Sequence, residues 1–389
     1  MIGEFRQVLA SLRAKVSNAF TKRQEMASIL NEAKVDLASG NFELASRHAS
    51  RILSSKSASR TSHLVAEFLL VQVRSRQGLF SGVLDQLNSL YERVPRTNVA
   101  LQAMVGNEIV RTCFRSGNLG IGAQRGEALY REHEKDWPSV EIVELLCQLS
   151  SCHYHRGDTE RAEEVVVKAL ALAESSKSPK SLTQSYWQSC VLSINRGDLV
   201  LALQFVLDAK HWAQIAGLQQ VLPKLNYNAA LIMLDLPNPD FETIQRLAEA
   251  TYLDLSSQNN AEGVAYVRTN LSELALRHED CESALLYAQR GLNEIPQEIP
   301  GPKAPLLVQV AKVFARMGNF TEAPAQLRAA VDHMESLEPS RELAKQWGHI
   351  ARVYVEVGLT DRGVYAYEKA IQMSGLLREE QEAKVNQVW

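Results

Sequence analysis

Glycine recurs along this chain at an almost constant spacing, and this spacing limits the possible folds more than any other feature. The first five of these glycines are 38, 39, 40 and 40 residues apart, and the last two are again 40 residues apart. They are Gly40, Gly78, Gly117, Gly157, Gly197, Gly318 and Gly358. The interval of 121 residues before Gly318 holds two further units and the regular step, with turns that we place near Pro237 and Glu279. A period near 40 residues over most of the chain predicts a solenoid of stacked repeats.

The stretch from Glu342 to Gly375 indicates what one repeat contains. Its diagnostic positions are Trp347, Ile350, Ala351 and Tyr354, followed by Gly358, Gly363, Tyr367 and Ala370. This order resembles the tetratricopeptide pattern W-x2-L-G-x2-Y…A-x3-F, with conservative replacements at several positions. In that pattern two antiparallel helices pack closely, because large residues of the first helix fill the space left by small residues of the second. Gly358 is expected to end the first helix, since glycine adopts the left-handed backbone conformation at little cost.

We therefore predict an all-α fold, a right-handed tetratricopeptide-like solenoid of about nine helical hairpins. The repeat array is expected to span residues 25–377. Residues 1–24 carry apolar residues at helical spacing, from Phe5 to Phe20, and are predicted to form an amphipathic capping helix. A dimerising or partner-binding helix is the alternative for this segment, which leaves a homodimer open. Residues 378–389 are predicted to be a polar C-terminal tail.

The composition is that of a folded soluble protein and excludes some classes of function. Of the 389 residues, 46% are hydrophobic and 22% are charged, and 42 basic residues nearly balance 45 acidic ones. Such a balance gives no global field that would favour nucleic acid or an anionic membrane. Because no apolar run approaches the ~20 residues that span a bilayer, and no signal-peptide pattern begins the sequence, we expect a cytoplasmic protein.

Motifs for enzymatic chemistry are missing from the sequence. It contains no dinucleotide-binding or phosphate-binding glycine motif, no H-E-x-x-H and no G-x-S-x-G. The five cysteines are odd in number and scattered, which indicates neither a disulfide framework nor a zinc knuckle. Cys147, Cys152 and His153 are a conceivable set of metal ligands, but positions 147 and 152 are about 140° apart on a helix. We expect no enzyme, no cofactor and no metal site.

The first helices of successive repeats are expected to line a groove that binds a protein or peptide. In repeats three to seven the expected groove positions are Asn107, Arg111, Phe114, Arg115, Tyr154, Trp187, Asn195, Tyr227, Thr269, Glu273 and Arg277. Asn and Arg side chains can satisfy a bound backbone and its carboxylates, while Tyr and Trp give contact area at low entropic cost. The alternative is that the aromatic residues are packing residues. We expect Arg111, Asn195 and Tyr227 to contact the partner directly.

Two stretches, Ser181 to Ala209 and Leu327 to Gly375, resemble the repeat region of actinobacterial Xre-type helix-turn-helix regulators. In the first, Tyr186-Trp187 is followed by Arg196-Gly197-Asp198-Leu199, and the second ends with Tyr367-Glu368-Lys369-Ala370. In that group a small DNA-binding domain precedes a long tetratricopeptide sensor. Here about 24 residues precede the repeats, which is too few for a helix-turn-helix domain. The resemblance therefore implies a stand-alone sensor, or one whose DNA-binding part this sequence does not include.

These observations favour a non-catalytic regulatory adaptor that binds a peptide or protein segment in a concave groove. The competing hypothesis is a transcription regulator, or its sensor half, that acts on DNA through a helix-turn-helix domain or partner. An enzyme is the third and least favoured hypothesis, because no catalytic site is recognisable.

The balanced charge generates a first prediction. This chain alone should not bind duplex DNA specifically, because it lacks the basic surface and the helix-turn-helix that such binding uses. A gel-shift assay against genomic fragments at ~0.15 M salt measures this. Retardation that survives excess competitor DNA would contradict the prediction.

Overall fold

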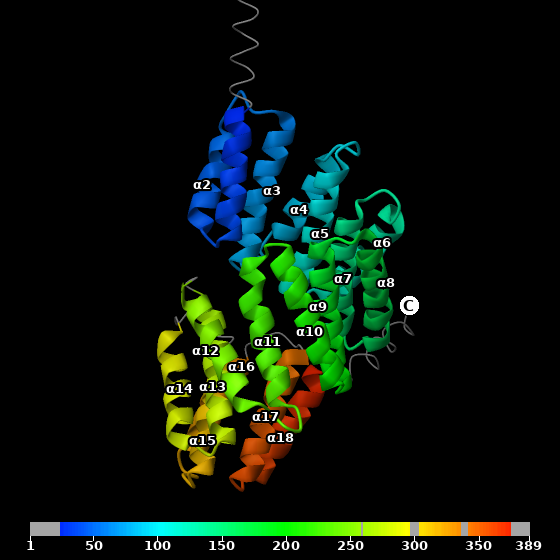
Figure 1. Ribbon diagram of the computed structural model, residues 1–389. Helices are drawn as coiled ribbons and strands as arrows, with labels where there is room; N and C mark the ends of the chain where they lie inside the picture. The colour runs from blue at the N-terminus through cyan, green and yellow to red at the C-terminus, as the bar shows by residue number, and fades with distance from the viewer. Residues whose placement is uncertain (1–23, 258–259, 296–302, 336–340, 375–389) are drawn as a thin grey trace, which may run out of the picture. The chain divides into compact units, whose positions relative to one another are not determined.

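The computed structural model describes residues 24–257, 260–295, 303–335 and 341–374, and within these residues every regular element is a helix (Figure 1). Residues 1–23 of the predicted capping helix and the predicted tail 378–389 lie outside the described residues. None of the described helices has both the length and the hydrophobicity that a bilayer-spanning segment requires. The predicted all-α class is confirmed.

Within the described residues the helices form nine consecutive hairpins. The pairs are residues 24–38 with α2 (Phe42–Leu53), α3 (Arg60–Arg76) with α4 (Val83–Arg93), α5 (Val99–Arg115) with α6 (Leu119–His133), α7 (Ser139–Arg156) with α8 (Thr159–Ser176), α9 (Pro179–Arg196) with α10 (Leu199–Ile215), α11 (Leu222–Leu234) with α12 (Phe241–Ser257), α13 (Ala261–Arg277) with α14 (Cys281–Glu294), α15 (Lys303–Arg316) with α16 (Ala323–Met334), and α17 (Arg341–Glu356) with α18 (Thr360–Met373). A short 3₁₀ helix, η1 (Gln219–Val221), precedes α11. The predicted tetratricopeptide-like hairpins are therefore present in the predicted number.

The turns within the hairpins have the predicted backbone conformation. All seven periodic glycines have positive φ, between 75° and 94°. Where the sequence has no glycine, Glu279 takes the same conformation, with φ of 61°. This strain costs a non-glycine residue on the order of 1–2 kcal/mol, and Asp280 offsets part of it by capping α14, its Oδ1 accepting from the Ser283 backbone N–H at 3.0 Å. The remaining predicted turn, near Pro237, lies between α11 and α12.

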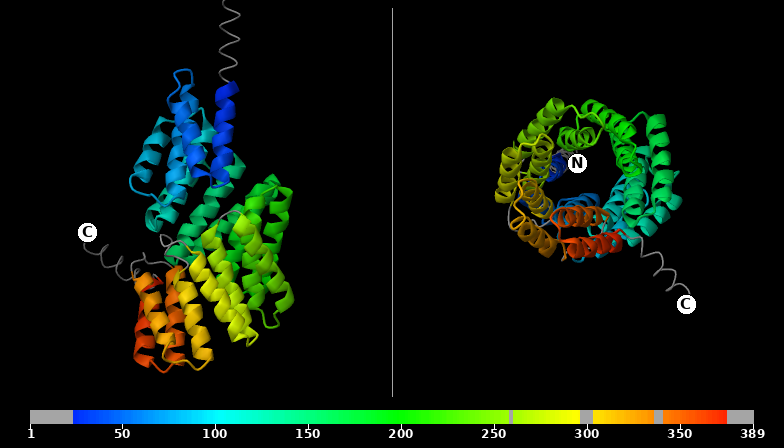
Figure 2. Two further views of the ribbon diagram at one scale, coloured as in Figure 1. Left: turned by 90° about the vertical axis from the view of Figure 1, so that its left-hand side faces the viewer. Right: turned by 90° about the horizontal axis from the view of Figure 1, so that it is seen from below.

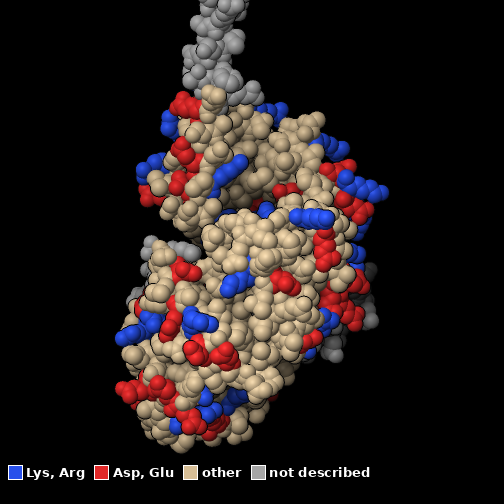
Figure 3. Space-filling model, viewed as in Figure 1, with Lys and Arg blue, Asp and Glu red and all other residues tan. Residues whose placement is uncertain are grey.

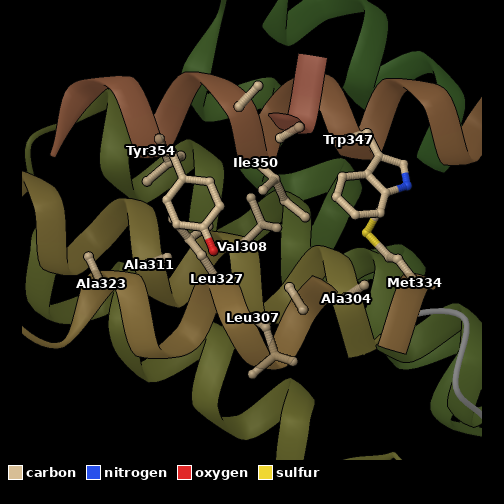
Figure 4. Packing of buried hydrophobic residues seen from close by; sticks show 14 of the residues in the cluster. Ala304, Leu307, Val308, Ala311, Ala323, Leu327, Met334, Trp347, Ile350 and Tyr354 are labelled. Carbon is tan, nitrogen blue, oxygen red and sulfur yellow. The ribbon is translucent and has the colours of Figure 1, made fainter. Parts of the chain in front are cut away.

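Close packing of large against small residues holds the last two hairpins together (Figure 4). Trp347 is fully buried and Tyr354 is 4% exposed, in one cluster with residues of α15, α16 and α18. The ring of Trp347 meets that of Tyr365 edge to face, with centroids 6.1 Å apart. At Gly363 a Cβ atom would lie 2.6 Å from Cγ2 of Val355, so no larger residue fits there without moving α17 from α18. This is the exchange of large and small residues that the repeat pattern predicts.

The chain divides into two compact units, the first up to Glu141 and the second from Ile142. Each unit has hydrophobic clusters of its own: Leu87 and Ile109 belong to one in the first, and Val206 and Trp347 to two in the second. Figure 2 shows the hairpins of the second unit following one another in chain order, from green to red. The boundary between the units falls inside α7.

Within each unit the first helices of consecutive hairpins pack against each other. In the first unit α3 contacts α5, and in the second α11 contacts α13, α13 contacts α15 and α15 contacts α17. Between the described residues within either unit, consecutive second helices make no comparable contacts. The first helices are therefore closer together than the second helices, and they form the inner face of each unit.

This packing generates a prediction about Trp347. Replacing it with alanine removes the largest fully buried side chain and should destabilise the last hairpins by ~3–5 kcal/mol. Hydrogen–deuterium exchange in residues 341–373 should rise first, because the end of an array unfolds before its middle. Tyr367→Ala is the control, since Tyr367 is 43% exposed on the neighbouring helix α18. Unchanged exchange in the Trp347 variant would show that the assigned packing is wrong.

Candidate binding surfaces on the first helices

A repeated hydrogen bond links the first helices along the inner face. The positions of both partners are counted back from the turn residue of each repeat, which is the periodic glycine or Glu279. The first partner lies six positions before the turn residue of one repeat, and the second lies nine positions before the turn residue of the next repeat. The pairs are Gln72 with Glu108, Ser151 with Gln188, and Glu273 with Gln309, at 2.9, 3.2 and 3.0 Å. Because these polar side chains hydrogen-bond to each other across neighbouring repeats, they contribute to the stacking of the repeats.

The inner face of the first unit contains a groove of about 390 Å³ between residues 24–38, α3 and α5. Most of its lining is apolar and includes Val65, Leu101 and Met104, of which Met104 is 37% exposed. Lys34 and Arg76 are the charged residues in this lining, and no carboxylate of the described residues joins them. Nη1 of Arg76 donates to the carbonyl oxygen of Leu37 at 2.9 Å, so this arginine also caps the preceding first helix.

A buried carboxylate lies beside this groove. Glu108 is 1% exposed, and its Oε2 accepts from Nε2 of Gln72 at 2.9 Å and from Nη1 of Arg111 at 2.6 Å. Nη1 of Arg115 is 3.9 Å from the other carboxylate oxygen. Burial lowers the pKa of both Arg76 and Arg115, and the charge of Glu108 opposes this shift. Arg76 therefore brings positive charge to the lining of a mostly apolar groove and is itself close to the buried carboxylate of Glu108.

An aromatic row crosses three consecutive first helices of the second unit. It consists of Trp187 on α9, Lys224 and Tyr227 on α11, and Tyr266 on α13. Nζ of Lys224 is 4.7 Å from the centroid of the Trp187 ring, within the range of a cation–π interaction. Lys224, Tyr227 and Tyr266 line a pocket of about 240 Å³. All three aromatic side chains are partly exposed, so they offer flat apolar surface and hydroxyl groups together.

Glu273 is the centre of a charged cluster on α13, α15 and α17. Its Oε2 accepts from Nζ of Lys312 and from Nε2 of Gln309, both at 3.0 Å. Burial alone would raise the pKa of Glu273, but Lys312, Gln309 and Arg277 outweigh burial and lower this pKa to about 2. Burial lowers the pKa of His349 to about 4, and nearby positive charges including Lys312 add to the shift, while Glu273 opposes it. His349 is therefore neutral at physiological pH.

Two of the predicted groove residues are buried. Asn107 is 1% exposed, and its Nδ2 donates to the backbone oxygen and to Oε2 of Glu141 at 3.1 and 3.0 Å. Tyr154 is 4% exposed and packs with Val166 and Leu192. Both side chains contribute to the packing between helices and present little surface to a ligand.

Four other predicted residues make polar contacts within the array. Arg111 and Arg115 surround Glu108, as described above. Oγ1 of Thr269 donates to the Ala265 carbonyl oxygen of its own helix at 3.0 Å. Arg277 donates to the Leu234 carbonyl oxygen and to Oδ1 of Asp235, so it caps α11 as Arg76 caps the first helix of the array.

The remaining predicted positions, Trp187, Asn195, Tyr227 and Phe114, are partly exposed. Trp187 and Tyr227 are brought into one row by Lys224. Asn195 lies two residues before Gly197, near the end of α9. The structure thus unites two of the three aromatic residues that the sequence predicts for the groove of the second unit, while Tyr154 is buried.

Sequence reasoning missed Lys34, Arg76, Lys224 and Tyr266. A register signal was available for two of them. Arg76 lies two residues before its turn glycine, as Arg115 does. Tyr266 lies thirteen residues before Glu279, the same register that Met104 has before Gly117. Lys34 and Lys224 give no such signal, because exposed lysines are common on any helix.

Four of the five cysteines are buried among the packed helices. Cys113, Cys147, Cys152 and Cys190 are buried, whereas Cys281 is partly exposed, and all five are free thiols. Burial raises the pKa of Cys147 and of Cys190 to about 12, which keeps these thiols protonated and unreactive. No group of three or more His, Cys, Asp or Glu side chains within the described ranges is arranged to hold a metal ion.

Comparison with solved structures gives three informative likenesses. A Rap protein complexed with competence and sporulation factor has a TM-score of 0.60 and 13% identity, covering 92% of this chain and 99% of that one. Aspartyl phosphate phosphatase F from Bacillus subtilis has a TM-score of 0.54 and 12% identity, covering 90% and 95%. NprR in complex with its cognate peptide NprX has a TM-score of 0.52 and 12% identity, covering 92% and 89%. At such identities these likenesses establish the fold.

No family model matches the sequence. No curated protein matches it either. The tetratricopeptide-like architecture therefore rests on the turns, the packing and the structural likenesses.

The charged cluster generates a prediction about acid stability. His349 has a folded-state pKa of about 4, below the value of about 6.5 of an unfolded histidine. Between these values the unfolded state binds more protons, so the stability of α17 should fall as the pH falls from 6.5 to 4. Glu273, with its pKa near 2, should lose its own contribution in a lower window, from about 4.5 downwards.

Hydrogen–deuterium exchange of α17 against pH measures this contribution. In the His349→Gln variant, the stability that α17 loses between pH 6.5 and pH 4 should be smaller than in the wild type by on the order of 1–2 kcal/mol. The Glu273→Gln variant should differ from the wild type only below pH 4.5. His211→Gln, on the exposed part of α10, is the control. An identical pH profile for the His349 variant and the wild type would refute the proposed burial of a neutral imidazole.

Proposed function

We propose that this protein is a non-catalytic regulatory adaptor that binds a peptide or protein segment on the inner face of its second unit. The observation that carries the proposal is the aromatic row of Trp187, Tyr227 and Tyr266, with its pocket of about 240 Å³. A pocket of this size accommodates one side chain of a bound segment, while the rings cover its neighbours. Tyr and Trp bury large areas with few rotatable bonds, which is why they dominate the binding energy of many interfaces.

Polar groups near the row suit an extended peptide backbone. The pocket lining also includes Asn260 and Glu262, at the start of α13. Asn195, which the sequence predicts as a contact, is partly exposed near the end of α9. An amide side chain both donates and accepts hydrogen bonds, so it can pair with a backbone N–H and C=O. We therefore assign Tyr227 to the anchoring contact and Asn195 to a backbone contact.

The structural likenesses support this class of ligand. One solved Rap protein is complexed with competence and sporulation factor, and NprR is complexed with its cognate peptide NprX. The five free thiols, four of them buried, fit a reducing compartment and so a cytoplasmic adaptor. The described residues supply no arrangement of nucleophile, base and oxyanion donors from which to argue catalysis.

The experiment that tests the proposal first identifies the ligand at the proposed position. A photo-crosslinking amino acid placed at Tyr227 in the full chain, with a control placed at Tyr367 on α18, should capture a segment that mass spectrometry then identifies. Capture at both positions alike would contradict a specific site at Tyr227.

Calorimetry with the identified peptide then measures the contacts. Tyr227→Ala and Tyr266→Ala should each weaken binding by ~1–4 kcal/mol, as truncation of an interface anchor does. Asn195→Ala should have a smaller effect, and Tyr367→Ala should have none. Wild-type affinity in folded Tyr227 and Tyr266 variants would remove the binding site from the aromatic row.

A further inference from the structure

We propose that the groove of the first unit is a second binding site, which takes a peptide segment carrying an aliphatic side chain next to a carboxylate. The groove lies between residues 24–38, α3 and α5 and has a volume of about 390 Å³. Val65, Leu69, Leu101 and Met104 line its apolar part. Lys34 and Arg76 line it as well, and they supply its positive charge. This site is separate from the aromatic row, so each can fail without the other.

Unlike some basic residues of the same unit, the two cations of the groove form no ion pair with a carboxylate of the described residues. Arg47 pairs with Glu43 at 2.7 Å and Arg51 pairs with Glu25 at 2.8 Å, so their charges are neutralised on the outer helix α2. Neither Lys34 nor Arg76 has a carboxylate within ion-pair distance in the described part of the unit; Arg76 binds a carbonyl oxygen, at Leu37. A guanidinium and an ammonium in the lining of one groove, with no carboxylate of the described residues in that lining, favour a carboxylate from outside.

The neighbouring network keeps this charge available. Glu108 is the nearest candidate to neutralise Arg76, but its Oε2 already accepts from Arg111 at 2.6 Å and from Gln72 at 2.9 Å. Arg115 is also close to Glu108, at 3.9 Å. One buried carboxylate therefore lies among several guanidiniums. Burial lowers the pKa of Arg76, which means that the partly desolvated cation gains from an added anion.

The apolar lining decides between a peptide and a nucleic acid. Phosphate backbones are bound mainly by rows of Lys and Arg, with contacts to many phosphates. Here only two cations of the described residues line the groove, and most of the remaining lining is apolar, including Met104, which is 37% exposed. A mostly apolar groove that also contains two cations suits a peptide in which an aliphatic side chain lies next to a carboxylate. That carboxylate belongs either to an acidic side chain or to a free C-terminus.

Three fluorescein-labelled octapeptides distinguish these possibilities with the full-length protein. The first carries two leucines and two glutamates at its centre and has a blocked C-terminus. The second has glutamines in place of the glutamates. The third is the second peptide with a free C-terminal leucine carboxylate. Fluorescence anisotropy should show binding of the first or third peptide about ten-fold tighter than the second, and whichever binds more tightly identifies the source of the carboxylate.

Matched variants locate the binding. The double substitution Lys34→Gln and Arg76→Gln should weaken binding of the acidic peptide about ten-fold. Arg47→Gln with Lys56→Gln removes the same charge from exposed positions outside the groove and should leave binding unchanged. Met104→Glu should also abolish binding, whereas Met104→Gln, with the same shape and no charge, should retain most of it. Circular dichroism confirms that each variant is folded, and Tyr227→Ala should have no effect on this peptide.

Four outcomes would overturn the proposal. The first is equal binding, or no binding, of all three peptides at millimolar concentration. The second is an equal loss of affinity in the two double variants, since that would indicate the field of the whole unit and not the groove. The third is equal affinity of the acidic peptide for the Met104→Glu and Met104→Gln variants. The fourth is competition by a short single-stranded oligonucleotide at the same concentration as the acidic peptide, which would assign the groove to polyanions in general.

Discussion

The close approach of the two helices in each hairpin is the constraint on which the rest of this structure depends. In the last hairpin a Cβ atom at Gly363 would lie 2.6 Å from Val355, while Trp347 is fully buried nearby. Such packing leaves no room for rearrangement, because cores are as dense as organic crystals. A hairpin of this kind still exposes an apolar face, and stacking against its neighbours covers that face.

Stacking in turn divides the inner face between two tasks. Some polar residues join one repeat to the next, as Gln72 joins Glu108 and as Glu273 joins Gln309. Others line the two cavities, such as Lys34 at the groove of the first unit and Tyr227 at the pocket of the second. A polar residue on the inner face is therefore a stronger candidate for binding when it does not hydrogen-bond to the neighbouring repeat. Arg277, which caps α11, illustrates the distinction.

The inner face and the remaining surface also differ in how charge is arranged. On the face seen in Figure 3, basic and acidic side chains are interspersed, and few of them lie over α10 and α11. The sequences of these helices agree, with Asp208, Lys210 and Lys224 as their charged residues. On the first helices α5 and α13, by contrast, charge is concentrated around the buried carboxylate of Glu108 and the partly buried carboxylate of Glu273. Charge is therefore concentrated locally in a chain whose net charge is only −3.

The sequence by itself determined the helical class, the repeat number and the turns, because these follow from local chemistry. Gly358 and the residues around Trp347 act within one hairpin, so their spacing is visible in the chain. The candidate sites were only partly predictable: Trp187 and Tyr227 were found, while Asn107 proved to be buried. Tertiary structure alone decided which inner-face residues pair between repeats, as Gln72 does with Glu108, whose carboxylate also accepts from Arg111 of its own helix. That choice depends on how far one repeat rotates on the next, and no spacing within a single repeat encodes this rotation.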